Sequence, residues 1–278
     1  MNAGNIQLRL KRRRLDDIFD FALLFLRENA LPFLKFVLPT ILFFTLLNTW
    51  LIHVLREAGD SATPEWKSFE HLALFALLIA EMPLIHFPVT LISGALVFSE
   101  KPRFRDIFRG FGRLGIRYFF HAVIWRTALY TVFAPLLITL WIGFVRKFFL
   151  EEVILLERLR GKDIRRRLAT LSSARSDRII GFLILNAGLA LVLFSLTLYS
   201  WSILLALLKV NIPHWTLDYS WSFLFPLTHV LFFFYAVFHA AAKFIFYLDV
   251  RSQLEGWDIE ILLRQGARES QTVDSAST

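Results

Sequence analysis

Apolar residues dominate this chain in long runs that short polar segments separate. Four runs are clear, at residues 31–55, 71–98, 179–209 and 222–248. Each exceeds the roughly 20 residues that an α-helix needs to cross the hydrocarbon core of a bilayer. A soluble domain with 56% hydrophobic residues could not bury so much apolar surface. The pattern therefore predicts an all-α polytopic membrane protein.

The stretch 118–157 allows two interpretations. As one helix and a loop, it gives five spans and places the basic segment 157–178 outside the cell, against the positive-inside rule. As two helices, 118–134 and 136–157, that turn at Ala134–Pro135, it gives six spans. We therefore expect six transmembrane helices in three hairpins, with both termini in the cytoplasm. Residues 1–265 would form one membrane domain, and the polar residues 266–278 a disordered tail.

The basic residues agree with six spans. In that topology 23 of them lie on the inner side, and Arg56, Lys67 and Lys209 lie on the outer side. The net charge of +8 then indicates cytoplasmic segments beside anionic lipid rather than a nucleic-acid surface. The apolar run after Lys11–Arg14 is too long for a signal peptide, and no small-residue cleavage site follows it, so we interpret it as an uncleaved first span.

A short pattern recurs before spans one, three and five. It occurs in "LDDIFDFALLFLREN" at 15–29, "FRDIFRGFGRLGIR" at 104–117 and "GKDIRRRLATLSSARSDR" at 161–178, with an Asp-Ile pair near each start. On a helical wheel each separates apolar from charged residues, which predicts interfacial amphipathic helices. Asp163, after Gly161, is the expected N-cap of the third. The arginines expected to contact lipid headgroups are Arg105, Arg109, Arg113, Arg165, Arg166 and Arg167.

Three segments resemble bacterial proteins of the glycerophosphoryl diester phosphodiesterase membrane-domain family. "RRLDDIFDFALLFLRENALPFLKF" is similar to the opening of that family, and "VRKFFLEEVILLERLRGKDIRRRLATLSSARSDRIIGFLIL" to its central region, with Glu157, Gly161 and Arg165–Arg167 in matching positions. "YLDVRSQLEGWDIEI" looks like its closing segment, and the matching residues are Tyr247, Asp249, Arg251, Glu255, Gly256, Trp257 and Asp258. The resemblance implies a membrane fold in the bacterial cytoplasmic (inner) membrane. It does not imply the phosphodiesterase activity, because the catalytic barrel would need roughly 250 further residues.

Motifs for catalysis or cofactor binding are missing from the sequence. There is no Gly-rich phosphate loop, no HExxH and no Gly-x-Ser-x-Gly, and the chain contains no cysteine. His53, His71 and His214 would lie near the outer face, which could suggest a metal site, but the seven histidines are scattered along the chain, and we interpret these three as interfacial histidines. We therefore expect no enzyme activity, no cofactor and no metal.

Charged residues within the spans are the strongest functional candidates, because each is costly in lipid. We expect one polar cluster, formed by Glu81, Arg126, Arg146, Glu151 and Glu152. In the tight hairpin of spans three and four, Arg126 would pair with Glu151 or Glu152.

Glu81 is followed closely by Pro83 and Pro88, and it has two interpretations. It is either part of a polar cavity or proton-coupled site, or a structural acid that pairs with Arg126 or a histidine or stays neutral. Lys35, His239 and Lys243 lie close enough to the inner end of their spans to snorkel to the interface.

The residues after the last span suggest a C-terminal clasp, formed by Tyr247, Asp249, Arg251, Glu255 and Trp257. The two aromatic residues would lie at the membrane interface, and the charged ones would meet arginines of the interfacial helices.

The function expected from these features is a non-enzymatic accessory or scaffold protein, with anionic lipids and membrane or envelope proteins as partners and no nucleic acid. The alternative is a transporter or lipid-handling protein with a polar intramembrane cavity. An enzyme that acts on lipid headgroups would need a convergent acid, base or metal set, which the sequence does not show.

Overall fold

The computed structural model describes residues 14–59, 64–98, 112, 115–116, 118–124, 127–128, 143–207 and 226–255. Every regular element in these residues is a helix, and the described part of the chain contains no strand. The all-α prediction is confirmed.

Four long helices form the body of the protein, α2 (Ala30–Gly59), α3 (Pro64–Phe98), α9 (Ser176–Leu207) and α11 (Pro226–Glu255). Each holds an apolar stretch long enough to cross a membrane, at Ala30–Val54, Ala76–Val97, Ser176–Thr197 and Thr228–Glu255. These stretches match the four clear runs of the sequence and indicate a multi-pass membrane protein. A hydrocarbon core about 30 Å thick takes about 20 helical residues, so the longer helices extend beyond it.

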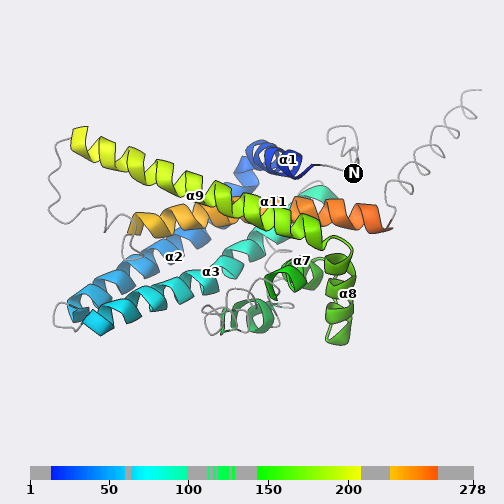
Figure 1. The fold of residues 1–278 in the computed structure, drawn as a ribbon, viewed down its shortest axis with the longest axis horizontal. Helices are drawn as coiled ribbons and strands as arrows, with labels where there is room; N and C mark the ends of the chain where they lie inside the picture. Colours follow the sequence, from blue (N-terminus) through cyan, green and yellow to red (C-terminus); the bar gives the residue numbers. More distant parts are fainter. Residues whose placement is uncertain are drawn as a thin grey trace, which may run out of the picture.

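Helix α11 is the central element. Figure 1 shows it between α9 on one side and α2 and α3 on the other. Of the membrane-spanning stretch of α11, 67% is buried, whereas only 11% of that of α9 is buried. Beyond its first two turns, α9 exposes large apolar side chains such as Leu191 and Leu196. Such residues are suited to lipid, so α9 is the peripheral helix and α11 the core helix.

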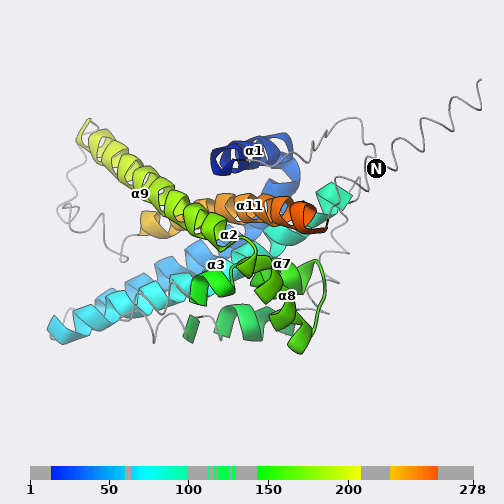
Figure 2. The ribbon, with the colours of Figure 1, turned by 45° about the vertical axis from the view of Figure 1, so that its right-hand side comes forward.

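Helix α1 (Leu15–Glu28) precedes the first span. The carboxylate of Asp17 accepts a hydrogen bond of 3.0 Å from the backbone N–H of Arg14, which satisfies a donor at the helix start. Figures 1 and 2 show α1 on the opposite side of α11 from α7 and α8. The rings of Phe19 and Phe182 stack with centroids 4.9 Å apart. The apolar face of α1 therefore packs on α9 and α11, and the expectation that it faces lipid was wrong.

The structure describes part of the stretch 118–157, for which the sequence allows two interpretations. A π-helix, η1 (Phe119–Ile124), and a short helix, α7 (Leu150–Leu155), are separated by undescribed residues that include the expected turn at Ala134–Pro135. The chain makes a turn before α7, where the N–H of Leu150 donates to the carbonyl of Lys147 at 3.0 Å. The predicted helix 136–157 is therefore not continuous at its end. All six residues of α7 are buried.

Helix α8 (Lys162–Ser173) follows α7 after a short loop. Its N-cap is Gly161, with φ of 51°, and not Asp163, which lies in the first turn. A positive φ favours glycine because it has no Cβ. Figures 1 and 2 show α8 running across the axes of α9 and α11 rather than along them. Its apolar face, which includes Ile164 and Leu168, is buried against neighbouring helices and does not face lipid as predicted.

Candidate functional site

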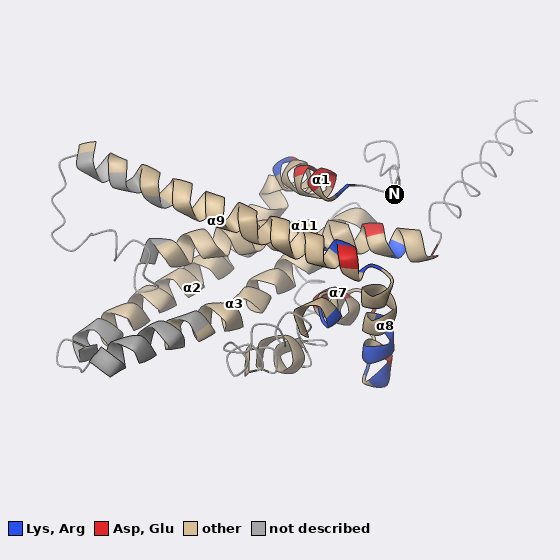
Figure 3. Cartoon of the chain, in the orientation of Figure 1, with Lys and Arg blue, Asp and Glu red and all other residues tan. Residues whose placement is uncertain are grey.

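Charged side chains gather where α8, the start of α9 and the end of α11 meet (Figure 3). We call this region the charged end. Its centre is Glu157, just after α7, whose two carboxylate oxygens accept hydrogen bonds of 2.9 and 2.8 Å from Nε of Arg167. The hydroxyl of Tyr247 donates to Oε1 of the same glutamate at 2.6 Å. Three segments, the α7–α8 loop, α8 and α11, are thereby joined.

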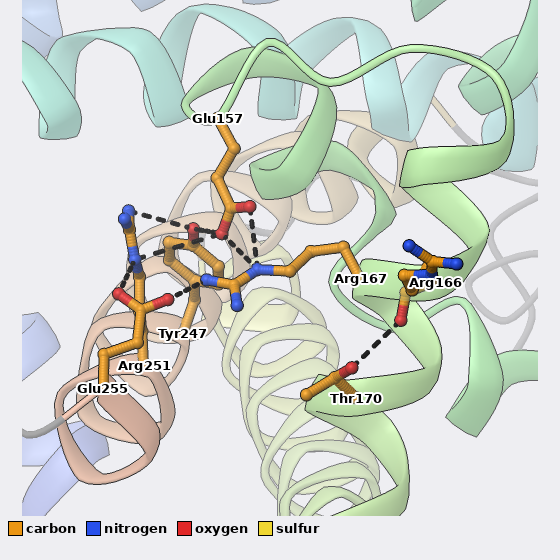
Figure 4. A network of polar contacts seen from close by, with 7 residues as sticks. All are labelled: Glu157, Arg166, Arg167, Thr170, Tyr247, Arg251 and Glu255. Carbon is orange, nitrogen blue, oxygen red and sulfur yellow. Dashed lines mark hydrogen bonds and ion pairs between the residues drawn. The ribbon is translucent and has the colours of Figure 1, made fainter.

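Glu255 extends this network, as Figure 4 shows. It accepts from Arg167 and, at 2.7 Å, from Nε of Arg251, which also lies 3.9 Å from Oε1 of Glu157. Arg167 and Arg251 therefore alternate with Glu157 and Glu255 in one network of ion pairs. Burial disfavours the charged guanidinium, but the hydrogen bonds to Glu157 and Glu255 outweigh it and raise the pKa of Arg167 above its ordinary value. Arg167 is thus a permanent cation of the network.

A second ion pair ties α9 to α11. Nη1 of Arg178 lies 2.7 Å from Oδ2 of Asp249, with side chains only 9% and 8% exposed. Gln253 donates to the same Oδ2 at 2.9 Å, and Arg175 donates to Gln253 at 3.1 Å. The guanidinium of Arg178 also lies 5.3 Å from the ring centroid of Phe246, within cation–π range.

Exposed cations lie on α8 and on the loop that precedes it. We call them the basic surface, and they are Arg158, Arg160, Lys162, Arg165 and Arg166. Figure 3 shows this concentration of positive charge along α8. Arg158 has a φ of 55°, which is uncommon for a residue other than glycine, and it begins the tight loop to α8. Burial, and after it the charge of Arg165, lowers the pKa of nearby Lys147.

Inside the bundle, Lys243 of α11 meets the two glutamates of α7. Its Nζ lies 2.7 Å from Glu151 and 3.3 Å from Glu152, and all three side chains are at most 3% exposed. Nδ1 of His86 lies 2.8 Å from Oε2 of Glu151, and Nε2 of His86 lies 3.3 Å from Nδ1 of His239. This core cluster joins α3, α7 and α11.

A third group lies further along α3 and α11, away from the charged end. The amide nitrogen of Asn48 lies 2.8 Å from Oε2 of Glu81 and 2.9 Å from Nδ1 of His229. All three side chains are buried. This group joins α2, α3 and α11.

The predicted single polar cluster is therefore divided. Glu151 and Glu152 lie together, but their described cation is Lys243, and Arg126 lies outside the described residues. Arg146 is exposed rather than buried. Glu81 belongs to the separate group with Asn48.

The predicted headgroup contacts are also divided. Arg165 and Arg166 are exposed on α8, whereas Arg167 is turned toward Glu157 and Glu255. The arginines of the second pattern, Arg105, Arg109 and Arg113, lie outside the described residues.

Two acidic residues of the predicted C-terminal clasp form ion pairs with arginines. Asp249 pairs with Arg178 and Glu255 with Arg167, both of which come from the third arginine-rich segment. Tyr247 is fully buried between the helices, where its hydroxyl donates to Glu157, and its place at the membrane interface stays a prediction. Trp257 lies outside the described residues.

Several polar residues of the core were missed or given no role. Lys243 and His239 were expected to snorkel, but both are buried. A signal was present, because polar residues recur every four positions on α11, so each lies about one turn from the next along a ridge that winds around the helix. They are Tyr235, His239, Lys243, Tyr247, Arg251 and Glu255. Asn48 and His229 offered no such signal, since each lies in an apolar run where the other polar residues within four positions are threonines.

Metal binding finds no support in the described residues, where no three His, Asp or Glu side chains are grouped to hold an ion. No protein-family profile, curated protein or solved structure matches the chain. The functional argument therefore depends on the geometry of these three groups and of the basic surface.

Proposed function

We propose that the protein is a non-enzymatic scaffold of the bacterial cytoplasmic membrane, which presents the basic surface to anionic lipid headgroups and to membrane or envelope proteins. One observation carries the proposal. Three consecutive arginines of α8 have opposite roles, since Arg167 is bound by Glu157 and Glu255 while Arg165 and Arg166 remain exposed. Figure 4 shows Arg166 directed away from that network. Arg167 fixes α8 in place, and the exposed Arg165 and Arg166 are free to bind partners.

The topology of the proposal has six spans in three hairpins, with both termini and the charged end in the cytoplasm. The positive-inside rule supports this orientation, because α8 and its loop are rich in arginine. A basic residue near an anionic leaflet contributes about 1 kcal/mol of attraction. The five cations of the basic surface would together be sufficient for a preference for anionic lipid.

The acids and bases at the charged end also favour a structural role over catalysis. Glu157, Asp249 and Glu255 each accept hydrogen bonds from arginine, so their carboxylate oxygens are already occupied. A general acid or base must instead lie within hydrogen-bond reach of a substrate. These carboxylates are therefore suited to hold helices together.

The test compares lipids retained by the protein in nanodiscs that contain phosphatidylglycerol and phosphatidylcholine. In the test variant Arg158, Arg160, Arg165 and Arg166 are replaced by glutamine, and the control replaces the exposed Arg27 and Lys35 of α1 and α2. We expect native mass spectrometry to show selective retention of phosphatidylglycerol by the wild type and the control, and loss of that selectivity in the test variant. Equal selectivity in all three would overturn the proposal.

A second candidate is a transporter or lipid-handling protein with a polar site in the membrane. The group around Glu81 favours it, because a carboxyl group deep in a span has no described cation beside it. Uptake assays alone would not separate the two candidates, since a scaffold can also bind protons or lipids.

A further inference from the structure

Glu81 is an isolated acid inside a spanning helix. It lies in the apolar stretch Ala76–Val97 of α3, and its residue is 2% exposed. Its Oε2 accepts a hydrogen bond from Asn48, while its Oε1 is buried and has no hydrogen-bond partner among the described residues. No ion pair joins Glu81 to a cation in the described part of the chain. The carboxyl group is therefore held by one neutral donor.

The hydrogen bonds of Asn48 determine the state of His229. An amide NH2 group has two hydrogens and accepts nothing, and here it donates to Oε2 of Glu81 and to Nδ1 of His229. Nδ1 must then be an acceptor, so the ring carries its hydrogen on Nε2 and is neutral. The nearest titratable group on α11 thus brings no positive charge to Glu81.

Among the described residues, the surroundings of Glu81 on the other sides are equally poor in charge. From α2 it meets Asn48, which does not titrate. From the segment before η1 comes Tyr118, whose hydroxyl donates to the carbonyl of Pro83 at 2.6 Å rather than to the carboxyl group. The next titratable group on α3 itself is His86, about 7.5 Å further along the helix axis.

An ionised carboxylate without a cation is costly in a low-dielectric core, whereas a neutral carboxylic acid is much less so. We propose that Glu81, Asn48 and His229 form a proton-binding site within the membrane, in which Glu81 takes up and releases one proton. Binding converts the carboxylate to the neutral acid, and release returns the proton to water through groups nearer the charged end. Asn48 holds Oε2 and leaves Oε1 to carry the hydrogen.

The core cluster supplies groups for that exchange. His86 touches both His239 and Glu151, and Glu151 touches Lys243, so titratable side chains continue from α3 toward the charged end. The hydroxyls of Thr90 and Ser93 lie on the same part of α3 and are buried without a hydrogen-bond partner among the described residues. Waters bridging such groups would complete a path for the proton.

The two prolines of α3 add acceptors beside this path. Pro83 has no N–H to donate to the carbonyl of Ile79, and Pro88 has none for the carbonyl of Leu84. In a membrane such carbonyls need other donors, which buried water can provide. The site and its route are thus independent of the basic surface, and this inference does not depend on the scaffold proposal.

Infrared spectroscopy of the protein in nanodiscs tests the site directly. A protonated carboxyl group has a carbonyl stretch separate from the amide bands, and this band shifts in heavy water. We expect the wild type to show such a band at neutral pH and to lose it as the pH is raised. Glu81→Gln should remove the component assigned to Glu81, which a difference spectrum separates from any contribution of the buried Glu152. The matched control Glu28→Gln, at an exposed position of α1, should leave the band unchanged.

Two results would overturn the inference. An identical band in Glu81→Gln would show that Glu81 carries no proton, and a band that persists at every pH at which the protein stays folded would show a permanently neutral acid. If Glu81→Gln does not fold, Asn48→Leu provides the test. It removes the hydrogen bond to Oε2, so the carbonyl stretch of a protonated Glu81 must change frequency. An unchanged frequency would contradict the site.

Discussion

The ammonium group of Lys243 on α11 lies 2.7 Å from the carboxylate of Glu151 on α7, and both side chains are almost completely buried. The same ammonium lies 3.3 Å from Glu152, so one lysine neutralises part of the charge of two neighbouring acids. This contact gives the two glutamates of α7 a cation within a helix whose six residues are all buried. The ion pairs hold α7 against the central helix.

Replacement of Lys243 by methionine should destabilise the protein strongly. Removing one partner of a buried ion pair leaves an uncompensated charge, which typically costs 3–5 kcal/mol, and we expect a loss of about that size in the free energy of unfolding. The measurement is a denaturant titration in detergent micelles, with Lys35→Met at an exposed position of α2 as the control. Adding Glu151→Gln and Glu152→Gln to Lys243→Met should recover much of the loss. A harmless Lys243→Met would refute the role of the pair.

The adjacent residues Arg166 and Arg167 allow a matched comparison. Arg167→Ala removes hydrogen bonds to Glu157 and Glu255, and a hydrogen bond to a charged group contributes about 1.5–3 kcal/mol. Arg166→Ala removes an exposed side chain and should change stability by less than about 0.5 kcal/mol. Thermal unfolding of the two variants in the same detergent gives the comparison. Equal midpoints would mean that the network around Glu157 does not stabilise the fold.

Gly161 is the position where the backbone requires glycine. Its φ of 51° at the start of α8 is strained for any residue with a Cβ, so Gly161→Ala should cost about 1–3 kcal/mol, although its Cβ would meet no atom within 4 Å. Gly188→Ala is the control, because Gly188 lies within α9 and also has open space around its Cβ. There alanine should be neutral or stabilising, since it is the better helix former. Similar losses in both variants would contradict the backbone argument.

The amino-acid pattern was sufficient for the four spanning helices, because the length and hydropathy of a run directly reflect the thickness of a bilayer. It was not sufficient for the partners of the buried charges. Glu151 was correctly placed in the core, yet its cation comes from Lys243, 92 residues away. Sequence distance gives no information on such contacts, and only the packing of α11 against α7 brings the two residues together.

The amphipathic helices show a related limit. The apolar face of α1, with Ile18 and Phe25, was identified correctly from the helical spacing of its apolar residues. That spacing does not determine whether lipid or protein covers the face. Here protein covers it. The four-residue spacing of polar groups on α11 is likewise present in the sequence, but spacing alone does not show which of these residues lie in the core and which at the membrane boundary.

The C-terminal clasp can be tested by truncation. A chain ending at Val250 loses Arg251 and Glu255, so Arg167 keeps only Glu157, whereas the pair of Arg178 and Asp249 remains. We expect faster amide hydrogen exchange in α8 and a lower thermal midpoint, because the link from α8 to the end of α11 is gone. A chain ending at Glu255 retains every described contact of the network and is the matched control. If the two truncated chains have the same midpoint and the same exchange in α8, the end of α11 does not act as a clasp, and α8 must be fixed by Glu157 and its apolar face alone.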